Sequence, residues 1–346
     1  MAFGAEASSS GTESLSIGAD AQASQTASIA LGRQAKATGK NSIATGIGAK
    51  ASASNSFASG AFANAAGTET IALGSASCAV SSGAIATGSE AKACGQNSVA
   101  YGRASTANGS ASISIGEGAS SGIQKGIQVE IRRDIQSGDP IYRSESRQTQ
   151  NTISIGYNAS TGYFDSENQS AIGNNSIAIG TESRALSDGS IAFGLLSNAS
   201  ELGSTAIGAF AAATGVNSSA FGRESVASAR NSIALGRLSK ATGNYSSAVG
   251  SESNAGGRNS TAIGAIAKSS GSFSTAIGTR SKATGYASTA VGQSSMEACV
   301  PCGPPCKTTR DSLALTVPQH FCNDCRYWPS ASCSLCWGGM RGVFGA

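Results

Sequence analysis

The chain has 346 residues, of which 45 are glycine, while only 13% are charged and 5% aromatic. So few large side chains exclude a wide core of interlocking leucine, phenylalanine and methionine. The small net charge of +4 and the presence of only six prolines argue against a disordered chain. A net charge of +4 also produces only a weak electrostatic field, which argues against nucleic acid as a partner. A single histidine, His320, excludes a histidine-centred catalytic triad in the body of the chain. We therefore expect a folded protein that is not an enzyme.

The N-terminal residues, MAFGAEASSSGTESLSIGAD, contain neither a basic segment nor an apolar segment of the kind found in secretion signals. No stretch of the chain holds the roughly eighteen consecutive apolar residues that a membrane-spanning helix needs. The sequence therefore predicts no signal peptide, no membrane anchor and no membrane insertion.

A motif of serine, apolar residue, alanine, apolar residue and glycine recurs along most of the chain. Its closing glycine, which we call the repeat glycine, returns every 14 residues in two series. The first series is Gly4, Gly18, Gly32, Gly46, Gly60, Gly74, Gly88, Gly102 and Gly116, and the second is Gly180, Gly194, Gly208, Gly222, Gly236, Gly250, Gly264, Gly278 and Gly292. Biased composition alone gives no fixed phase, so this pattern is a true structural repeat.

Each repeat divides into two halves, because many repeats carry a second glycine seven residues after the first, as Gly39 does. Alternation in the first half sets Ala30 on one face and Ile29 and Leu31 on the other. In the second half, alanines share one face and Lys36 points away from them. The pattern predicts an all-β solenoid with two walls of short parallel strands and an interior that holds little more than methyl groups.

The outward aliphatic residues of the first half form a stripe along the solenoid. Its clearest members are Ile29, Leu31, Ile71, Leu73, Ile191, Phe193, Ile233 and Leu235. Exposed apolar surface of that extent is rare on a soluble monomer, so we expect these residues to form an interface between copies of the chain. The alternative, a lid formed by residues 117–179, is too short to cover both series of repeats.

Repeats such as NSIALGRLSKATG (231–243), NSIATGIGAKASA (41–53) and STAIGTRSKATG (274–285) closely resemble the head repeat of trimeric autotransporter adhesins, the YadA-like head domain. The resemblance covers residues 1–116 and 175–292. It implies a left-handed parallel β-roll and a homotrimer with the aliphatic wall facing the common axis.

The chain departs from those adhesins because it shows neither sustained heptads for a coiled-coil stalk nor a membrane anchor. Similar repeats occur in fibre-like proteins of phages and large viruses. We therefore expect a structural, adhesive trimeric fibre or head at the surface of a virion or a cell, with a host-cell or extracellular receptor or glycan as partner. A secreted bacterial adhesin head and an ice-binding solenoid remain alternatives, the latter because threonines such as Thr261 and Thr275 recur in the second series.

The phase of the repeat is lost between Gly116 and Gly180, although Gly156 closes one further motif. The segment GIQVEIRRDIQSGDPIYRSESR (126–147) alternates apolar and polar residues around an SGDP turn, which predicts a β-hairpin or arm. Loops that interrupt a rigid repeat are common recognition surfaces. Candidate contact residues are Arg132, Arg133, Tyr142, Arg143, Tyr157, Tyr163 and Phe164, and we expect the last three to lie close together. The alternative is a clasp between chains or a joint between two head segments.

Seven of the nine cysteines fall in the last part of the chain. Two Cys-x-x-Cys pairs, Cys299 with Cys302 and Cys322 with Cys325, have the spacing of a zinc ribbon. Disulfides are the competing interpretation.

The expected organisation is a first block of repeats (1–122), a non-repeat insertion with the arm (123–174), a second block (175–293) and a cysteine-rich segment (294–346).

Overall fold

The computed structural model describes residues 1–122, 124–133, 140–148, 150–165 and 170–297. The chain divides into two compact units, Met1–Ser228 and Ala229–Ala346. All regular structure in the described residues is β-strand, and none of them forms a helix that could cross a membrane.

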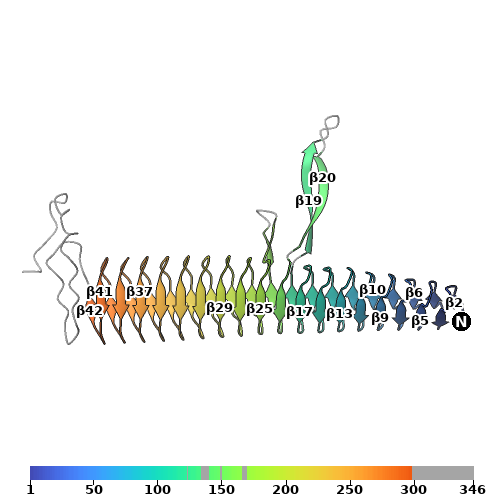
Figure 1. Ribbon diagram of the computed structural model, residues 1–346, viewed down its shortest axis with the longest axis horizontal. Coiled ribbons are helices and arrows are strands. Elements are labelled where there is room, and N and C mark those ends of the chain that lie inside the picture. The colour runs from blue at the N-terminus through green and yellow to red at the C-terminus, as the bar shows by residue number, and fades with distance from the viewer. Residues whose placement is uncertain (123, 134–139, 149, 166–169, 298–346) are drawn as a thin grey trace, which may run out of the picture. The chain divides into compact units, whose positions relative to one another are not determined.

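Each 14-residue repeat forms one coil with two strands and two turns (Figure 1). A three-residue strand in the first wall ends at the repeat glycine, where the first turn begins, and a two-residue strand in the second wall precedes the second turn. Successive coils pair in parallel at a register of one repeat, so that Ile29 lies beside Ile43 and Lys36 beside Lys50. This confirms the expected all-β parallel solenoid.

The first wall of the first unit is formed by β1 (Ala2–Phe3), β3 (Leu15–Ile17), β5 (Ile29–Leu31), β7 (Ile43–Thr45), β9 (Phe57–Ser59), β11 (Ile71–Leu73), β13 (Ile85–Thr87), β15 (Val99–Tyr101), β17 (Ile113–Ile115), β21 (Ile153–Ile155), β25 (Ile177–Ile179), β27 (Ile191–Phe193), β29 (Thr205–Ile207) and β31 (Ser219–Phe221). Its second wall is formed by β2 (Ser8–Ser9), β4 (Gln22–Ala23), β6 (Lys36–Ala37), β8 (Lys50–Ala51), β10 (Asn64–Ala65), β12 (Cys78–Ala79), β14 (Lys92–Ala93), β16 (Thr106–Ala107), β18 (Ser120–Ser121), β22 (Ser160–Thr161), β26 (Arg184–Ala185), β28 (Asn198–Ala199), β30 (Ala212–Ala213) and β32 (Val226–Ala227).

The second unit repeats the same two walls. Its first wall is formed by β33 (Ile233–Leu235), β35 (Ser247–Val249), β37 (Thr261–Ile263), β39 (Thr275–Ile277) and β41 (Thr289–Val291), and its second wall by β34 (Lys240–Ala241), β36 (Asn254–Ala255), β38 (Lys268–Ser269), β40 (Lys282–Ala283) and β42 (Met296–Glu297).

Alanine fills the space between the walls, as the sequence predicts. Ala30 and Ala44 of the first wall and Ala37 of the second are completely buried, whereas Lys36 is exposed on the outer face of its strand. The two walls lie so close together that methyl groups alone fill the gap at these positions.

A row of buried serines closes the second turn, a role that the sequence motif does not reveal. The Ser42 hydroxyl donates a hydrogen bond of 2.6 Å to the Gly39 carbonyl oxygen and accepts one of 3.2 Å from the Gly39 N–H. The same hydroxyl-to-carbonyl bond recurs at Ser28, Ser56, Thr70, Ser98, Ser176 and Ser190 in the first unit and at Ser232, Ser274 and Ser288 in the second. These bonds add to the backbone bonds of the same turn, such as that from the Ser42 N–H to the Gly39 carbonyl oxygen, and satisfy a hydroxyl that is buried in the narrow interior.

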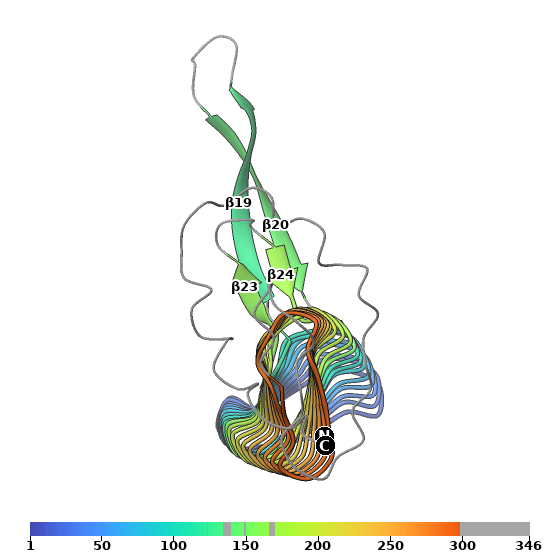
Figure 2. The ribbon, with the colours of Figure 1, turned by 90° about the vertical axis from the view of Figure 1, so that its left-hand side faces the viewer.

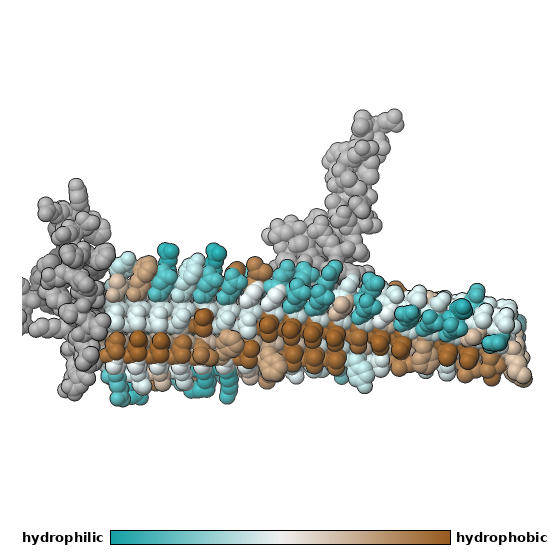
Figure 3. Space-filling view, viewed as in Figure 1, coloured by the Kyte–Doolittle hydropathy of each residue, from teal (hydrophilic) through white to brown (hydrophobic). Residues whose placement is uncertain are grey.

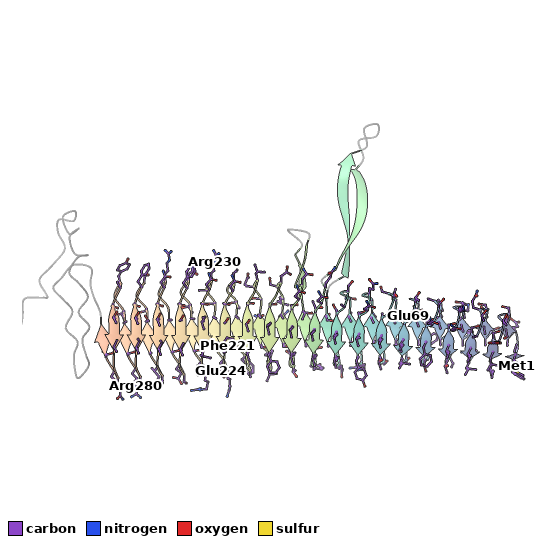
Figure 4. The ribbon with its side chains drawn as sticks, in the orientation of Figure 1. Met1, Glu69, Phe221, Glu224, Arg230 and Arg280 are labelled. Atoms are coloured by element: carbon purple, nitrogen blue, oxygen red, sulfur yellow. The ribbon has the colours of Figure 1, made fainter. Side chains whose placement is uncertain are left out.

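Glycine is required at the first turn because neighbouring backbones approach closely there. Gly32 has a φ of 126°, and a Cβ added to it would lie 2.6 Å from the Gly46 carbonyl oxygen of the next coil. Each turn also holds one residue in the left-handed region. Glu69 (φ 59°) and Glu224 (φ 57°) are examples, and Figure 4 shows them at opposite edges of the coils of the first unit.

Two insertions explain why the phase is lost after Gly116. Gly116 and Gly156 are 40 residues apart and Gly156 and Gly180 are 24 apart, so the coils carry 26 and 10 extra residues. The stack nevertheless continues, because β17 pairs with β21 and β21 with β25 in the usual parallel register. One regular coil, formed by residues 150–162, therefore lies within the segment expected to be a non-repeat insertion.

Both insertions leave their coils at the second turn and form antiparallel hairpins. The first hairpin pairs β19 (Gln124–Arg133) with β20 (Pro140–Gln148), which confirms the predicted hairpin. The second pairs β23 (Tyr163–Asp165) with β24 (Ser170–Ile172). Figure 2 shows the two hairpins on the same side of the first unit.

Candidate functional site

The outer face of the first wall presents two columns of side chains. The first column consists of the residues three positions before each repeat glycine, such as Ile29, and the second of the residues directly before it, such as Leu31. Both side chains are half-buried in the single chain, although Ala30 between them is fully buried. Figure 3 shows this face of the coils, where the aliphatic members of the columns form brown rows.

The eight stripe residues named from the sequence all belong to these two columns. Ile29, Ile71, Ile191 and Ile233 stand in the first column and Leu31, Leu73, Phe193 and Leu235 in the second. Exposure reaches 51% at Phe193, 45% at Ile233 and 46% at Leu235. Their assignment to an interface between chains stays a prediction, but the geometry brings them together as that prediction requires.

The composition of the first column changes along the chain. Between β17 and β27 both columns are built from isoleucine, apart from Phe193 at the end of β27. In the second unit the first column changes from Ile233 to serine and threonine, whereas the second column stays aliphatic from Leu235 to Val291. The threonines therefore share the aliphatic face, where they lie beside isoleucine or valine rather than forming a flat threonine surface.

The first hairpin, which we call the arm, carries four of the candidate contact residues. Arg132 pairs with Ile141 and Arg133 with Pro140 in the backbone register, and Val129 pairs with Arg143. The register shifts between Glu130 and Arg132, which marks a β-bulge. Tyr142 pairs with Glu130, so all four candidates lie in the half of the arm that is distant from the coils.

The remaining aromatic candidates are not brought together as expected. Tyr157 directly follows the repeat glycine Gly156 and is 49% exposed in the first turn of its coil. Tyr163 and Phe164 begin the second hairpin, which leaves the same coil at the second turn. Opposite turns of one coil therefore separate Tyr157 from the other two residues. Sequence proximity misled the expectation, because the two-residue strand β22 crosses the coil between them.

The four cysteines proposed as zinc ligands or disulfide partners, Cys299, Cys302, Cys322 and Cys325, lie outside the described residues. Within residues 1–297, leaving aside the undescribed gaps, no three histidine, cysteine or acidic side chains are grouped as a metal site requires. Cys78 and Cys94, in neighbouring coils, are free thiols and half-buried. Burial raises the pKa of the Cys94 thiol, the Cys78 thiol raises it further, and Lys92 acts in the opposite direction.

Coils of 14 residues with an alanine core and an aliphatic outer wall define a parallel β-solenoid. The family model of the YadA head domain repeat matches the chain thirteen times. The matches cover residues 1–21, 9–35, 37–63, 51–77, 93–119, 171–197, 185–211, 199–225, 213–239, 227–253, 241–267, 255–281 and 269–295. The chain belongs to the YadA head repeat family.

Heads of this family are structural and adhesive, typically form homotrimers, and are displayed at cell surfaces or outside cells. No curated protein matches the chain. The gap in the family match between residues 119 and 171 coincides with the arm and the interrupted coil, so the arm is a feature of this chain that the family repeat does not account for.

Proposed function

We propose that the chain forms a homotrimeric, adhesive head of a fibre that attaches to a host-cell or other extracellular surface. The observation that carries the proposal is the aliphatic first wall, because its two columns remain half-exposed over the length of each unit in a single chain. Soluble proteins rarely keep an apolar strip of this extent in water, and three copies facing one axis would bury it.

The rest of the coil suits a rigid support rather than a catalyst. Its interior is filled by alanine, and each backbone turn is fixed by buried serine or by close glycine contacts. A fibre on a virion or a phage, or a head on a bacterial surface, needs this combination of stiffness and inert surface. We place the chain in a virion or phage fibre, with the bacterial adhesin head as the alternative that the family repeat also permits.

Attachment is assigned to the arm. It projects from the second turn of one coil and carries Arg132, Arg133, Tyr142 and Arg143 in its distal half. Charged and aromatic residues are sparse on the coils, so the arm differs most from the supporting surface, and loops on rigid scaffolds commonly carry recognition.

A deletion of residues 123–148 tests this assignment. It removes the 26 extra residues and restores the usual spacing of 14 between Gly116 and Gly156, so the stack of coils is expected to remain intact. The matched control is a deletion of residues 163–172, which removes the second hairpin and restores the same spacing between Gly156 and Gly180. We expect the first deletion to weaken attachment to cells strongly and the second to leave it unchanged, with both proteins still trimeric by light scattering.

Other outcomes would argue against the proposal. If the first deletion removes trimerisation, the arm is a clasp between chains. If attachment is unchanged by both deletions, the contact surface lies on the coils alone.

A further inference from the structure

The second wall of the first unit contains a shallow hollow of about 420 Å³ near its first turn. It is lined by Asp20, Gln22, Gln34, Lys36, Gly48, Lys50 and Phe62. These residues come from four successive coils and stand in two neighbouring columns, two and four positions after the repeat glycine. The hollow lies along the first turn and the outer face of the second wall, so its lining residues are outside the two columns proposed as the interface between chains.

A missing side chain creates the hollow. Gly48 stands where the neighbouring coils carry Gln34 and Phe62, and the Phe62 ring lies over it: a Cβ added to Gly48 would be 2.9 Å from Phe62 Cδ1. Phe62 is 65% exposed and has a φ of 59°. An aromatic residue is uncommon in this left-handed conformation, which asparagine and glycine adopt more readily. Phe210 and Ile266 occupy the same repeat position, but Phe62 differs from them because its ring lies beside a glycine of the preceding coil.

Two lysines border the hollow, and neither forms an ion pair among the described residues. Lys36 and Lys50 are register partners in neighbouring strands, and both are exposed. The described residues form ion pairs at Arg103–Glu117, Arg223–Glu224 and Arg237–Glu252, and neither lysine is among them. Like charges side by side on adjacent strands repel each other, and a bound anion would relieve that repulsion.

The rest of the lining is suited to hydroxyl groups. Gln22 and Gln34 offer amide donors and acceptors, and the Asp20 carboxylate is an acceptor only. A simple inorganic anion would make no contact with the apolar Phe62 ring and would be repelled by the Asp20 carboxylate. A neutral sugar would provide no negative charge for Lys36 and Lys50. One ligand that carries an acid group, several hydroxyls and an apolar face matches the whole set.

We propose that this hollow binds an acidic sugar residue of a surface glycan. The apolar face of the sugar packs on Phe62, its carboxylate or sulfate lies between Lys36 and Lys50, and its hydroxyls bond to Gln34 and Asp20. The inference deepens the adhesive function proposed above by naming a ligand class, but it is independent of the arm.

The test uses the purified full chain and three soluble probes: sialyllactose, a heparin-derived sulfated oligosaccharide, and lactose as the neutral comparison. Calorimetry is expected to detect binding of at least one acidic probe and none of lactose, and the two acidic probes distinguish a carboxylate from a sulfate as the recognised group. Gly48→Asn is the decisive variant, because asparagine tolerates the φ of 65° but its side chain fills the hollow. We expect it to weaken binding by about tenfold or more.

The matched control is Gly189→Asn. Gly189 has a φ of 64°, and a Cβ there would meet nothing within 4 Å, so the same substitution should leave both fold and binding unchanged. Lys50→Gln should also weaken binding of the acidic probe, by about fivefold or more, because a charge-assisted contact is lost. Melting temperatures are measured for each variant to show that the coils remain folded.

Equal binding of lactose and the acidic probes would overturn the proposal, as would equal affinities of the Gly48→Asn and Gly189→Asn proteins. Absence of binding to every probe overturns it as well. If the wild-type protein still attaches to cells in that case, the adhesive function is retained and only the glycan site is refuted. Failure of the glycan site can therefore be distinguished from failure of the proposed function.

Discussion

Ile29 and Ile43 are register partners in neighbouring coils, and both side chains lie outside the alanine core. The alanines between the flanking residues, Ala30 and Ala44, are completely buried. One face of the first wall thus fills the interior of the coil, while the other face is aliphatic and half-exposed. A strand with two apolar faces is typical of a buried strand, so the outer face is expected to be covered by another chain.

Leu235→Asp should separate the chains or unfold them. Leu235 is 46% exposed in the single chain and lies in the proposed interface, where an unpaired carboxylate would cost several kcal/mol. Lys240→Asp is the control, because it introduces the same side chain at an exposed position on the opposite wall. Light scattering is expected to show loss of the trimer for the first variant only, and equal masses for the two would contradict the interface.

Ala234→Leu should destabilise the protein by about 1–3 kcal/mol per chain, because three added carbon atoms have no space between the walls. Lys240→Ala, on the exposed face of the next strand, should change stability little. Thermal unfolding measures the difference. Equal melting temperatures would show that the interior is wider than the structure indicates.

Two substitutions of buried serines should change the free energy of unfolding in opposite directions. The Ser114 hydroxyl is buried and has no hydrogen-bond partner, and its register partner Ala100 shows that alanine fits this column. Ser114→Ala should therefore raise the free energy of unfolding, by about 1 kcal/mol. Ser42→Ala removes both bonds to Gly39 and should lower it, by about 1–3 kcal/mol. Denaturant titrations measure the free energy of unfolding of each variant. A change in the same direction for both variants would refute the roles assigned to Ser114 and Ser42.

Cys94 should react slowly with iodoacetamide near pH 8. Its pKa is raised, chiefly by burial and further by Cys78, so less thiolate is present in the folded chain than in the unfolded chain. The raised pKa favours the protonated folded form, so the associated stability is present at lower pH and is lost as pH rises through the folded pKa. Mass spectrometry of the Cys94 peptide should show faster alkylation in urea than in buffer. The difference between the two alkylation rates should become smaller as pH rises. Equal rates in the folded and unfolded chains at pH 8 would contradict the shift.

The sequence predicts the coil well because its information is periodic. Alternation alone separates Ala30 from Ile29 and Lys36, and the regular glycines define both turns. Alternation around a turn signal likewise predicts the arm. These features depend on local patterns that repeat or on strands that directly follow each other.

Features that depend on contacts between coils were not predictable in the same way. The role of Ser42 depends on the path of the second turn, which brings its hydroxyl to Gly39. The hollow at Gly48 appears only when four coils are stacked, because its lining residues are 14 positions apart in each column. Tyr157 and Tyr163 are near each other in sequence but lie at opposite turns of one coil.

The mass of the purified chain in solution tests the central claim, that the aliphatic wall joins three copies into an adhesive head. Light scattering coupled to size exclusion is expected to give three times the chain mass of 34.0 kDa, and the mass should not fall on dilution. A stable, well-folded monomer of 34.0 kDa would contradict the account, because the half-exposed columns of the first wall would then face water without a partner.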